Sequence, residues 1–308
     1  MSNAAGRHVA VLMGGRSAER EVSLVSGAGV ARALVEKGYR VTGVDVGADV
    51  ARQLEAIRPD VCFNALHGRW GEDGCIQGLL EMMGIPYTHS GVRASANAMD
   101  KPTARQIFGA AGIPVAEGRV CTREELLAGE PMARPYVVKP INEGSSVGVQ
   151  IVLEGESDLS GRLADWRFGA AVLVERYIPG REVQVAVMGD AVLGAIEIVP
   201  LGRFYDYETK YQEGRARHLM PAPIHPAAYA EACELTLKAH RVLGCRGVTR
   251  ADLRYDDTAG EPGRLVMLEI NTQPGMTPLS LVPEIAAHRG ISYPDLVSWI
   301  VEDASCDR

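Results

Sequence analysis

The chain has 308 residues, of which 46% are hydrophobic and 23% charged, as in an ordinary globular protein. This length exceeds what one hydrophobic core usually holds, so we expect two or three domains. The formal net charge of −7 argues against nucleic acid or an anionic membrane as the main partner, and no apolar run approaches the ~20 residues that cross a bilayer.

The chain start and the cysteines predict the compartment. The segment from Met1 to Ala4 is short and polar, and we do not expect a secretory signal there. Six cysteines are scattered through the chain without a Cys-x-x-Cys pair. We therefore expect structural thiols in a reduced, cytoplasmic compartment and no cysteine nucleophile.

The first third of the chain alternates strand and helix patterns. Apolar runs at residues 8–13, 40–46 and 61–66 are separated by helical patterns at 19–37 and 50–57. This order predicts parallel βαβ units in a doubly wound, Rossmann-like domain that ends near residue 96. Ligands of such sheets gather at the carboxyl ends of the strands, where Gly14-Gly15 and His67-Gly68 stand.

The remainder reads as two further α/β portions, residues 97–178 and 179–308. The first is predicted to contain a helix at 101–111, strands at 136–139, 147–152 and 172–175, and a helix at 158–166. The second is predicted to contain strands at 182–188 and 191–199, a polar loop at 203–220, a helix at 225–243, strands at 247–255 and 264–270, and terminal helices.

Two of the last strands carry metal-type oxygens. Glu269 and Asn271 are two positions apart at a strand end, so they point to the same face. Asp252 interrupts the apolar alternation of the preceding strand. If the strands pair, three oxygen donors converge on a hard cation such as Mg²⁺. The alternative is a strand end with solvated polar residues.

A lysine at a strand end and a small-residue loop indicate a phosphate site. Lys139 ends an apolar strand, and residues 142–148 form a glycine-rich loop before the next strand. Glycines let backbone N–H groups approach a phosphate, and a buried ammonium requires an anionic partner. The order of residues is not that of a Walker loop. The alternative is an ordinary hairpin with a flexible tip.

Three further segments are ambiguous when taken alone. Glu21 at the start of the first helix either caps that helix or holds a substrate ammonium. His67 follows a strand in a glycine-dense loop, although a lone histidine is usually structural. Residues 204–211 combine aromatic and charged side chains, as in loops that cover a reaction site or in a self-packed surface excursion.

Together these motifs resemble the D-alanine–D-alanine ligases of the ATP-grasp superfamily. The matching segments follow the order of that family and cover nearly the whole chain: residues 14–23, His67-Gly68, Met99-Asp100-Lys101, residues 143–148, residues 204–207, Lys210-Tyr211 and residues 269–277. The resemblance implies a three-domain ATP-grasp fold with ATP between the central and C-terminal domains. It also implies a homodimer and a role in peptidoglycan precursor synthesis.

The resemblance assigns the nucleotide and metal residues. Those expected at the phosphates are Lys101, Lys139, Lys210 and the closing loop with Ser146 and Val147. Those expected at adenine and ribose are Glu175, Arg176, Tyr177, Ile178 and Glu182. Asp252, Glu269 and Asn271 would bind two Mg²⁺ ions, with Mn²⁺ as a substitute.

The resemblance also assigns the substrate residues. A hydrogen-bonded trio of Glu21, Ser145 and Tyr211 would lie beside the substrate, and His67 near the first D-alanine. The remaining pocket residues would be Arg250, Gly275, Ser280 and Leu281, the first two at the developing oxyanion. ATP would phosphorylate one D-alanine, and the amine of the second would displace phosphate.

Two alternatives stay open. Another ATP-grasp carboxylate–amine ligase, of the D-alanyl-D-lactate or D-alanyl-D-serine type, would use the same metal and phosphate residues. The tyrosine of the 204–211 loop favours the dipeptide. A non-catalytic nucleotide-binding protein is disfavoured by the intact metal and lysine set. Small departures from the family pattern are Trp70, Arg176, Gln273 and Pro278.

Overall fold

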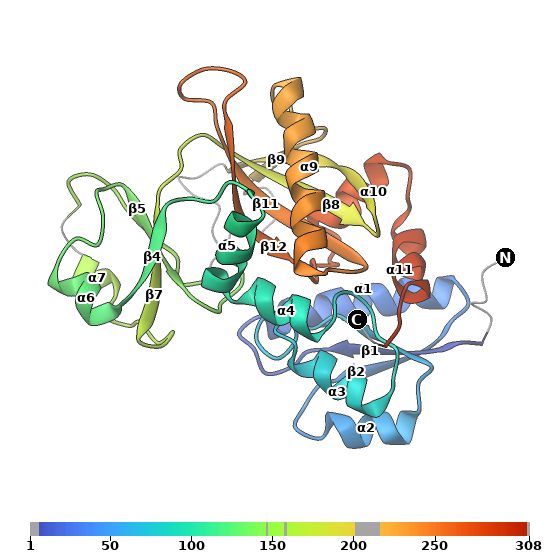
Figure 1. Cartoon of the computed structure of the whole chain (residues 1–308). Helices are drawn as coiled ribbons and strands as arrows, with labels where there is room; N and C mark the ends of the chain where they lie inside the picture. The colour runs from blue at the N-terminus through green and yellow to red at the C-terminus, as the bar shows by residue number, and fades with distance from the viewer. Residues whose placement is uncertain (1–5, 146, 157–158, 201–215, 307–308) are drawn as a thin grey trace.

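The computed structural model describes residues 6–145, 147–156, 159–200 and 216–306, which form three β-sheets (Figure 1). The N-terminal sheet is parallel, with strand order β2-β1-β3. Its strands are β1 (His8–Met13), β2 (Arg40–Asp45) and β3 (Val61–Asn64). They agree with the three predicted apolar runs to within two residues at each end.

Helices cover both faces of this sheet because its central strand is apolar on both sides. Val9 and Val11 of β1 share a core with α1 (Arg20–Glu36). Ala10 and Leu12 face the other way and share a core with α2 (Val50–Ile57) and α3 (Cys75–Met83). The predicted doubly wound arrangement is therefore confirmed.

The central sheet is antiparallel, in the order β4-β7-β5-β6. Its elements are β4 (Gly118–Thr122), α6 (Arg123–Ala128), β5 (Tyr136–Pro140), β6 (Gln150–Val152), α7 (Leu159–Arg162) and β7 (Ala171–Arg176). Strand β4 was not predicted, and α7 is shorter than the predicted helix. Strand β6 starts later than predicted because Gly148 has a φ of +74°. A Cβ there would lie 2.5 Å from the Phe168 ring.

The C-terminal sheet is antiparallel, in the order β10-β9-β8-β11-β12. Its strands are β8 (Arg181–Met188), β9 (Ala191–Pro200), β10 (Ala216–Leu219), β11 (Val248–Asp256) and β12 (Arg264–Asn271). Strand β10 falls inside the predicted polar loop. Helices α5 (Lys101–Ala110) and α9 (Pro226–Leu243) share one core with this sheet.

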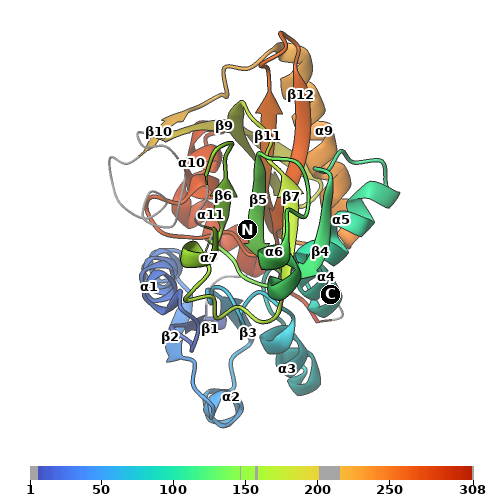
Figure 2. The same cartoon turned by 90° about the vertical axis from the view of Figure 1, so that its left-hand side faces the viewer.

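The opposite face of the C-terminal sheet meets the N-terminal part of the chain. Helices α10 (Leu281–His288) and α11 (Tyr293–Glu302) lie there, and their apolar residues form one core with α1 and β9. Helix α4 (Val92–Met99) leads from the N-terminal part into α5. Figure 1 shows the central sheet standing to one side of this block, and Figure 2 looks onto that sheet with the block behind it.

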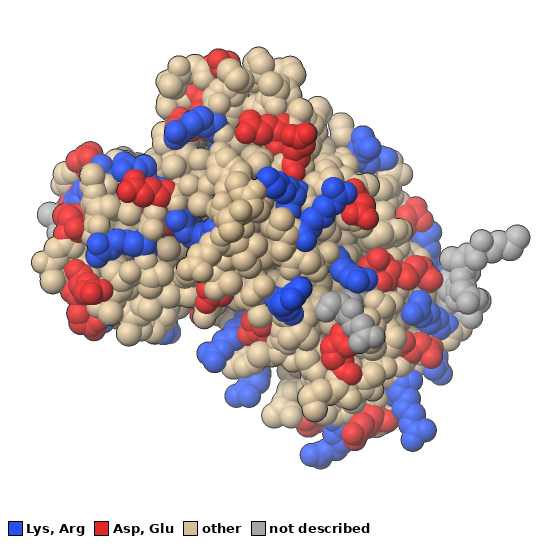
Figure 3. All heavy atoms as spheres, in the orientation of Figure 1, with Lys and Arg blue, Asp and Glu red and all other residues tan. Residues whose placement is uncertain are grey.

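The three sheets support the expected three-domain α/β architecture, and the limits at residues 96 and 178 stay predictions. In the part of the chain that the structure describes, no helix is long and apolar enough to cross a membrane. On the face drawn in Figure 3, acidic and basic side chains are interspersed rather than gathered by sign.

Candidate active site

Two adjoining cavities lie where the three sheets meet. The larger, about 590 Å³, opens between the central and C-terminal sheets. The smaller, about 90 Å³, lies between the ends of β11 and β12 and the N-terminal domain. Lys101, Glu143 and Glu269 line both cavities. A ligand in one cavity can therefore approach a ligand in the other across these three residues.

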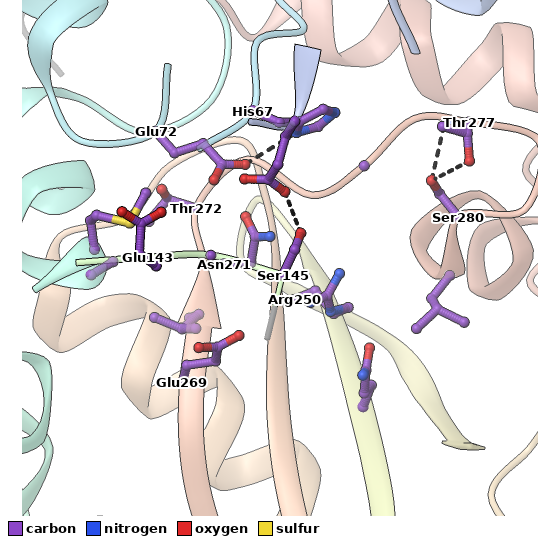
Figure 4. A pocket seen from close by; sticks show the side chains of 18 of the residues that line it. His67, Glu72, Glu143, Ser145, Arg250, Glu269, Asn271, Thr272, Thr277 and Ser280 are labelled. Atoms are coloured by element: carbon purple, nitrogen blue, oxygen red, sulfur yellow. Dashed lines mark hydrogen bonds and ion pairs between the residues drawn. The ribbon is translucent and has the colours of Figure 1, made fainter. Parts of the chain in front are cut away.

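The predicted metal residues lie at this boundary. Asp252 of β11 pairs directly with Glu269 of β12. Asn271 pairs with Arg250, and Figure 4 shows Glu269, Asn271 and Arg250 at these strand ends. Asp252 lines the larger cavity, Asn271 the smaller and Glu269 both. Like charges opposite each other on neighbouring strands are destabilising. The two carboxylates and the amide therefore suit a divalent cation with oxygen preference.

Neighbouring cations orient these acids. Arg250 donates to both oxygens of Asp252, from Nε at 2.7 Å and from a terminal nitrogen at 3.1 Å. Lys101 lies 3.8 Å from Glu269. Within the described ranges, no three His, Cys, Asp or Glu side chains form a metal cluster. A cation here would accordingly depend on the Asn271 oxygen.

Lys139 is held by a buried carboxylate. Glu175 of β7 is 3% exposed and accepts from Lys139 of β5 at 2.5 Å and from Arg105 of α5. Arg105 also donates to the carbonyl of Ala116 at 2.6 Å. Burial alone would raise the pKa of Glu175, but the two cations outweigh it and hold that pKa below its usual value.

The other residues expected at the nucleotide line the larger cavity: Val147, Arg176, Tyr177, Ile178 and Glu182. The carboxylate of Glu175 faces Lys139 and Arg105, so its contact with adenine stays a prediction. Ser146, Lys210 and Tyr211 lie outside the described residues.

The smaller cavity brings together the expected substrate residues: His67, Ser145, Arg250, Gly275, Ser280 and Leu281. Ser280 lies just before α10, and its Oγ accepts from the Thr277 N–H at 2.9 Å. A Cβ at Gly275 would lie 2.8 Å from the same Oγ. A side chain at position 275 would push the Ser280 hydroxyl away from its hydrogen bond with the Thr277 N–H.

His67 is buried between two polar partners. Its ring nitrogens lie 3.1 Å from Ser26 Oγ and 3.2 Å from Glu72 Oε1. Burial opposes its ionisation, but the hydrogen bond and charge of Glu72 prevail and raise the pKa of His67. Glu72 also accepts from the Gly68 N–H at 3.0 Å, which ties the ends of the His67 loop together.

The structure corrects the expected position of one acid. Ser145 donates to Glu19, not to Glu21. Glu19 is 6% exposed and lines the smaller cavity, whereas Glu21 is exposed and among the described lining residues of neither cavity. Residues two apart at a helix start lie about 200° apart around its axis, so both cannot face the pocket. The prediction for Glu21 is wrong.

Sequence reasoning missed several residues of the site. Glu19 lies in the matching segment 14–23, but Glu21 was expected at the pocket in its place. Glu72 lies five residues after His67, a loop spacing without a regular period. Arg105 is one turn after Lys101 on α5, a spacing that places both on one face. Thr272 and Gln184 also line the smaller cavity; Thr272 stood in the matching segment 269–277 without an assigned role, and Gln184 carried no signal.

The chain is similar to known proteins along nearly its whole length. Residues 107–302 match the family model described as D-ala D-ala ligase C-terminus, and residues 46–90 match the model described as D-ala D-ala ligase N-terminus. A D-alanine–D-alanine ligase of Paramagnetospirillum magneticum is 61% identical, over 98% of this chain and 99% of the relative. One of Parvibaculum lavamentivorans is 59% identical over 98% and 99%.

Solved structures agree. A D-alanine–D-alanine ligase of Bacillus anthracis is 30% identical, with a TM-score of 0.83 over 96% of this chain and 97% of that chain. A structure of a Bacillus anthracis D-alanine–D-alanine ligase complexed with ATP has a TM-score of 0.80, 30% identity and coverage of 97% and 96%. Fold, site and relatives coincide over nearly the full length, so the chain belongs to the D-alanine–D-alanine ligase family.

Proposed function

We propose that this chain joins two molecules of D-alanine into D-alanyl-D-alanine, a peptidoglycan precursor, and converts ATP to ADP and phosphate. The observation that carries this proposal is the wall shared by the two cavities. Lys101 and Glu269 line both the space suited to a nucleotide and the space suited to a small amino acid. A phosphoryl group could therefore pass from one to the other without leaving charged surroundings.

The larger cavity is proposed to hold ATP. Lys139 and Lys101 would meet the phosphates, because an ammonium binds an anion best where little water competes. Residues 176–178 and Glu182 would line the adenosine part. The pairing of Lys139 with Glu175 supports this role, since the carboxylate holds the lysine side chain at the wall of the larger cavity.

Asp252, Glu269 and Asn271 would hold Mg²⁺, with Mn²⁺ as a substitute and two ions in the full site. The ions would neutralise charge on the phosphates, as they do in phosphoryl transfer generally. The paired acids on β11 and β12 fit this role by their oxygen chemistry and mutual repulsion. Arg250 would keep Asp252 in place through its two hydrogen bonds.

The smaller cavity is proposed to hold the two alanines. Ser280 and Leu281 stand at the start of α10, where free N–H groups and the helix dipole favour a carboxylate. Glu19 offers a carboxylate for an ammonium group, and Ser145 fixes its direction. His67, with its pKa raised by Glu72, would supply a positive charge near the first alanine.

Chemistry at this site would need no nucleophile from the protein. A carboxylate has no leaving group, so transfer of the γ-phosphoryl group to one carboxylate oxygen of the first D-alanine makes an acyl phosphate and releases ADP. The amine of the second D-alanine then attacks the acyl carbon, loses a proton and expels phosphate. Arg250 and the N–H groups near Gly275 would stabilise the oxyanion, and a closed cavity would exclude water.

A ligase that accepts D-lactate or D-serine as its second substrate is the main alternative. The expected Tyr211 role supports the dipeptide, and Tyr211→Phe should weaken selection against D-lactate. ATP-dependent phosphate release should be measured with D-alanine, L-alanine and D-lactate side by side. We expect D-alanine to be the only one of the three that supports phosphate release. Release with L-alanine but not with D-alanine would refute the proposal.

Two variants test the site itself. Glu269→Ala and Lys139→Ala should abolish phosphate release, because one removes an oxygen donor for Mg²⁺ and the other a phosphate contact. Glu36→Ala, an exposed acid on α1, is the control and should leave the rate unchanged. Near-normal turnover in either site variant would contradict the assignment. A homodimer and a cytoplasmic location remain predictions from the sequence.

A further inference from the structure

Gln273 connects the C-terminal sheet to the N-terminal domain through its side chain. It follows β12 by two residues and is 1% exposed. Its Oε1 accepts from Asn64 Nδ2 at 2.5 Å, and its Nε2 donates to the carbonyl of Leu66. These partners lie more than 200 residues earlier in the chain, at the end of β3. One buried amide thus spans two domains with both of its ends satisfied.

Asn64 extends this contact along the loop that carries His67. Its Nδ2 also donates to the Gly71 carbonyl at 2.9 Å, and its Oδ1 accepts from the Leu66 N–H at 3.2 Å. Gln77 adds a second donor to the Gly71 carbonyl at 2.8 Å. The loop is therefore held on both sides of His67 by buried amides, and such networks fix geometry because an unmade bond is costly.

The backbone of Gln273 is bonded to Asn271, one of the candidate metal ligands at the end of β12. Its backbone N–H donates to Asn271 Oδ1 at 2.9 Å, so its Cα is tied to the end of β12. Its side chain holds Leu66, the residue before His67. Gln273 therefore fixes the distance between the His67 loop and the end of β12. His67 and Asn271 line the same small cavity, from opposite domains.

We infer that Gln273 is a positioning residue that places His67 for the first D-alanine. This inference rests on the proposed function of the small cavity. Gln273 touches no substrate itself; it acts by fixing the backbone at Leu66, and so the ring of His67 between Ser26 and Glu72. Its removal should therefore affect D-alanine and spare the nucleotide, whose cavity has neither Leu66 nor His67 among its described lining residues.

The test uses Gln273→Glu, which keeps the size and the acceptor for Asn64 but replaces the donor to the Leu66 carbonyl with an oxygen. Binding is measured calorimetrically for D-alanine in the presence of a non-hydrolysable ATP analogue, and for the analogue alone. D-alanine should bind about tenfold more weakly, as expected for one lost buried hydrogen bond, and the affinity for the analogue should change by less than about twofold.

Gln77→Glu is the matched control for a carboxylate buried in the same network. Gln77 is also 1% exposed, but the Gly71 carbonyl keeps its bond from Asn64 when Gln77 is changed. We expect less than about a threefold loss of D-alanine affinity in this variant. An equal loss in both variants would overturn the role of Gln273, because any buried charge would then have the same effect.

A double-mutant cycle separates positioning from general destabilisation. If Gln273 acts through His67, adding Gln273→Glu to His67→Asn should weaken D-alanine binding no further. If the double variant instead loses D-alanine affinity by the product of the two single losses, the inference is overturned. Should Gln273→Glu fail to fold, the apolar Gln273→Met of similar length enters the same cycle. A wild-type protein that binds no D-alanine would refute the proposed function, whereas a normal wild type with an unaffected variant would refute only the role of Gln273.

Discussion

The Arg105–Glu175–Lys139 bridge yields the sharpest stability prediction. Glu175→Gln keeps the shape of the side chain but leaves two cations without their shared counter-charge. The side chains of Arg105 and Lys139 are 13% and 14% exposed, and that of Glu175 is 4% exposed. Breaking a buried pair costs about 3–5 kcal/mol. Arg105 keeps its bond to the Ala116 carbonyl, so we expect the lower limit, about 3 kcal/mol.

Thermal unfolding provides the assay. At about 2.1 cal/mol/K of unfolding entropy per residue, 1 kcal/mol shifts the Tm of a 308-residue chain by about 1.5 °C, so Glu175→Gln should unfold about 5 °C below the wild type. Glu117→Gln is the control, because Glu117 pairs at the surface with Arg176, the neighbour of Glu175 on β7. The side chain of Glu117 is 68% exposed and that of Arg176 is 46% exposed. That pair should contribute at most about 1 kcal/mol. Equal Tm values for the two variants would refute the reasoning.

The same variant has a defined pH dependence. The pKa of Glu175 is lower in the folded chain than its usual value of 4.5, so its charge stabilises the fold above that pH. This contribution is lost as the pH falls below 4.5 and through the folded-state pKa. The gap in Tm between wild type and Glu175→Gln should therefore be full at neutral pH and narrow in acid. A gap that is constant from pH 7 to pH 3 would contradict the assigned cause.

Two further predictions concern His67 and a glycine. Because Glu72 raises the pKa of His67, the stabilisation is fully present below the usual value of 6.5 and is lost as pH rises through the folded-state pKa. The Tm gap between wild type and Glu72→Gln should accordingly shrink from pH 6 to pH 9, and a gap that grows would count against the pairing. Gly180→Ala places a Cβ 2.1 Å from the Tyr255 carbonyl at a φ of +89°, whereas Gly244→Ala has a similar positive φ and open space. Gly244→Ala should lower the free energy of unfolding by about 1–2 kcal/mol, and Gly180→Ala should lower it clearly more. Equal losses in the two variants would show that the Tyr255 carbonyl moves aside.

Regular local patterns made most of the fold predictable. Strands β1, β8 and β12 are rich in apolar residues and have clear ends, and they were predicted nearly residue for residue. Strand β4 has exposed residues at three of its five positions, so its burial pattern resembles that of a loop. Strand β10 has no fully buried residue and depends on pairing with β9 for its existence.

Pairing across the chain explains both the successes and the failures at the site. Asp252 and Glu269 could be combined because strand alternation fixes which face each side chain takes, and the register confirms that they are opposite. Glu21 was assigned in place of Glu19, two residues and about 200° away around the helix axis, because a local pattern does not show which side of α1 meets the pocket. The contact of Arg105 with Glu175 depends on how α5 packs on the central sheet, which no local pattern encodes.

The shared core of α1, α10, α11 and β9 has a mechanical consequence. The N-terminal and C-terminal parts should move as one rigid block, since separating them would expose the large apolar surface that they bury together. The central sheet has an apolar core of its own and could swing as a separate lobe. We therefore expect the pocket walls that these two parts contribute to keep their shape throughout turnover, while Ser145 moves with the lobe that carries Lys139. The nucleotide would enter and leave through that motion.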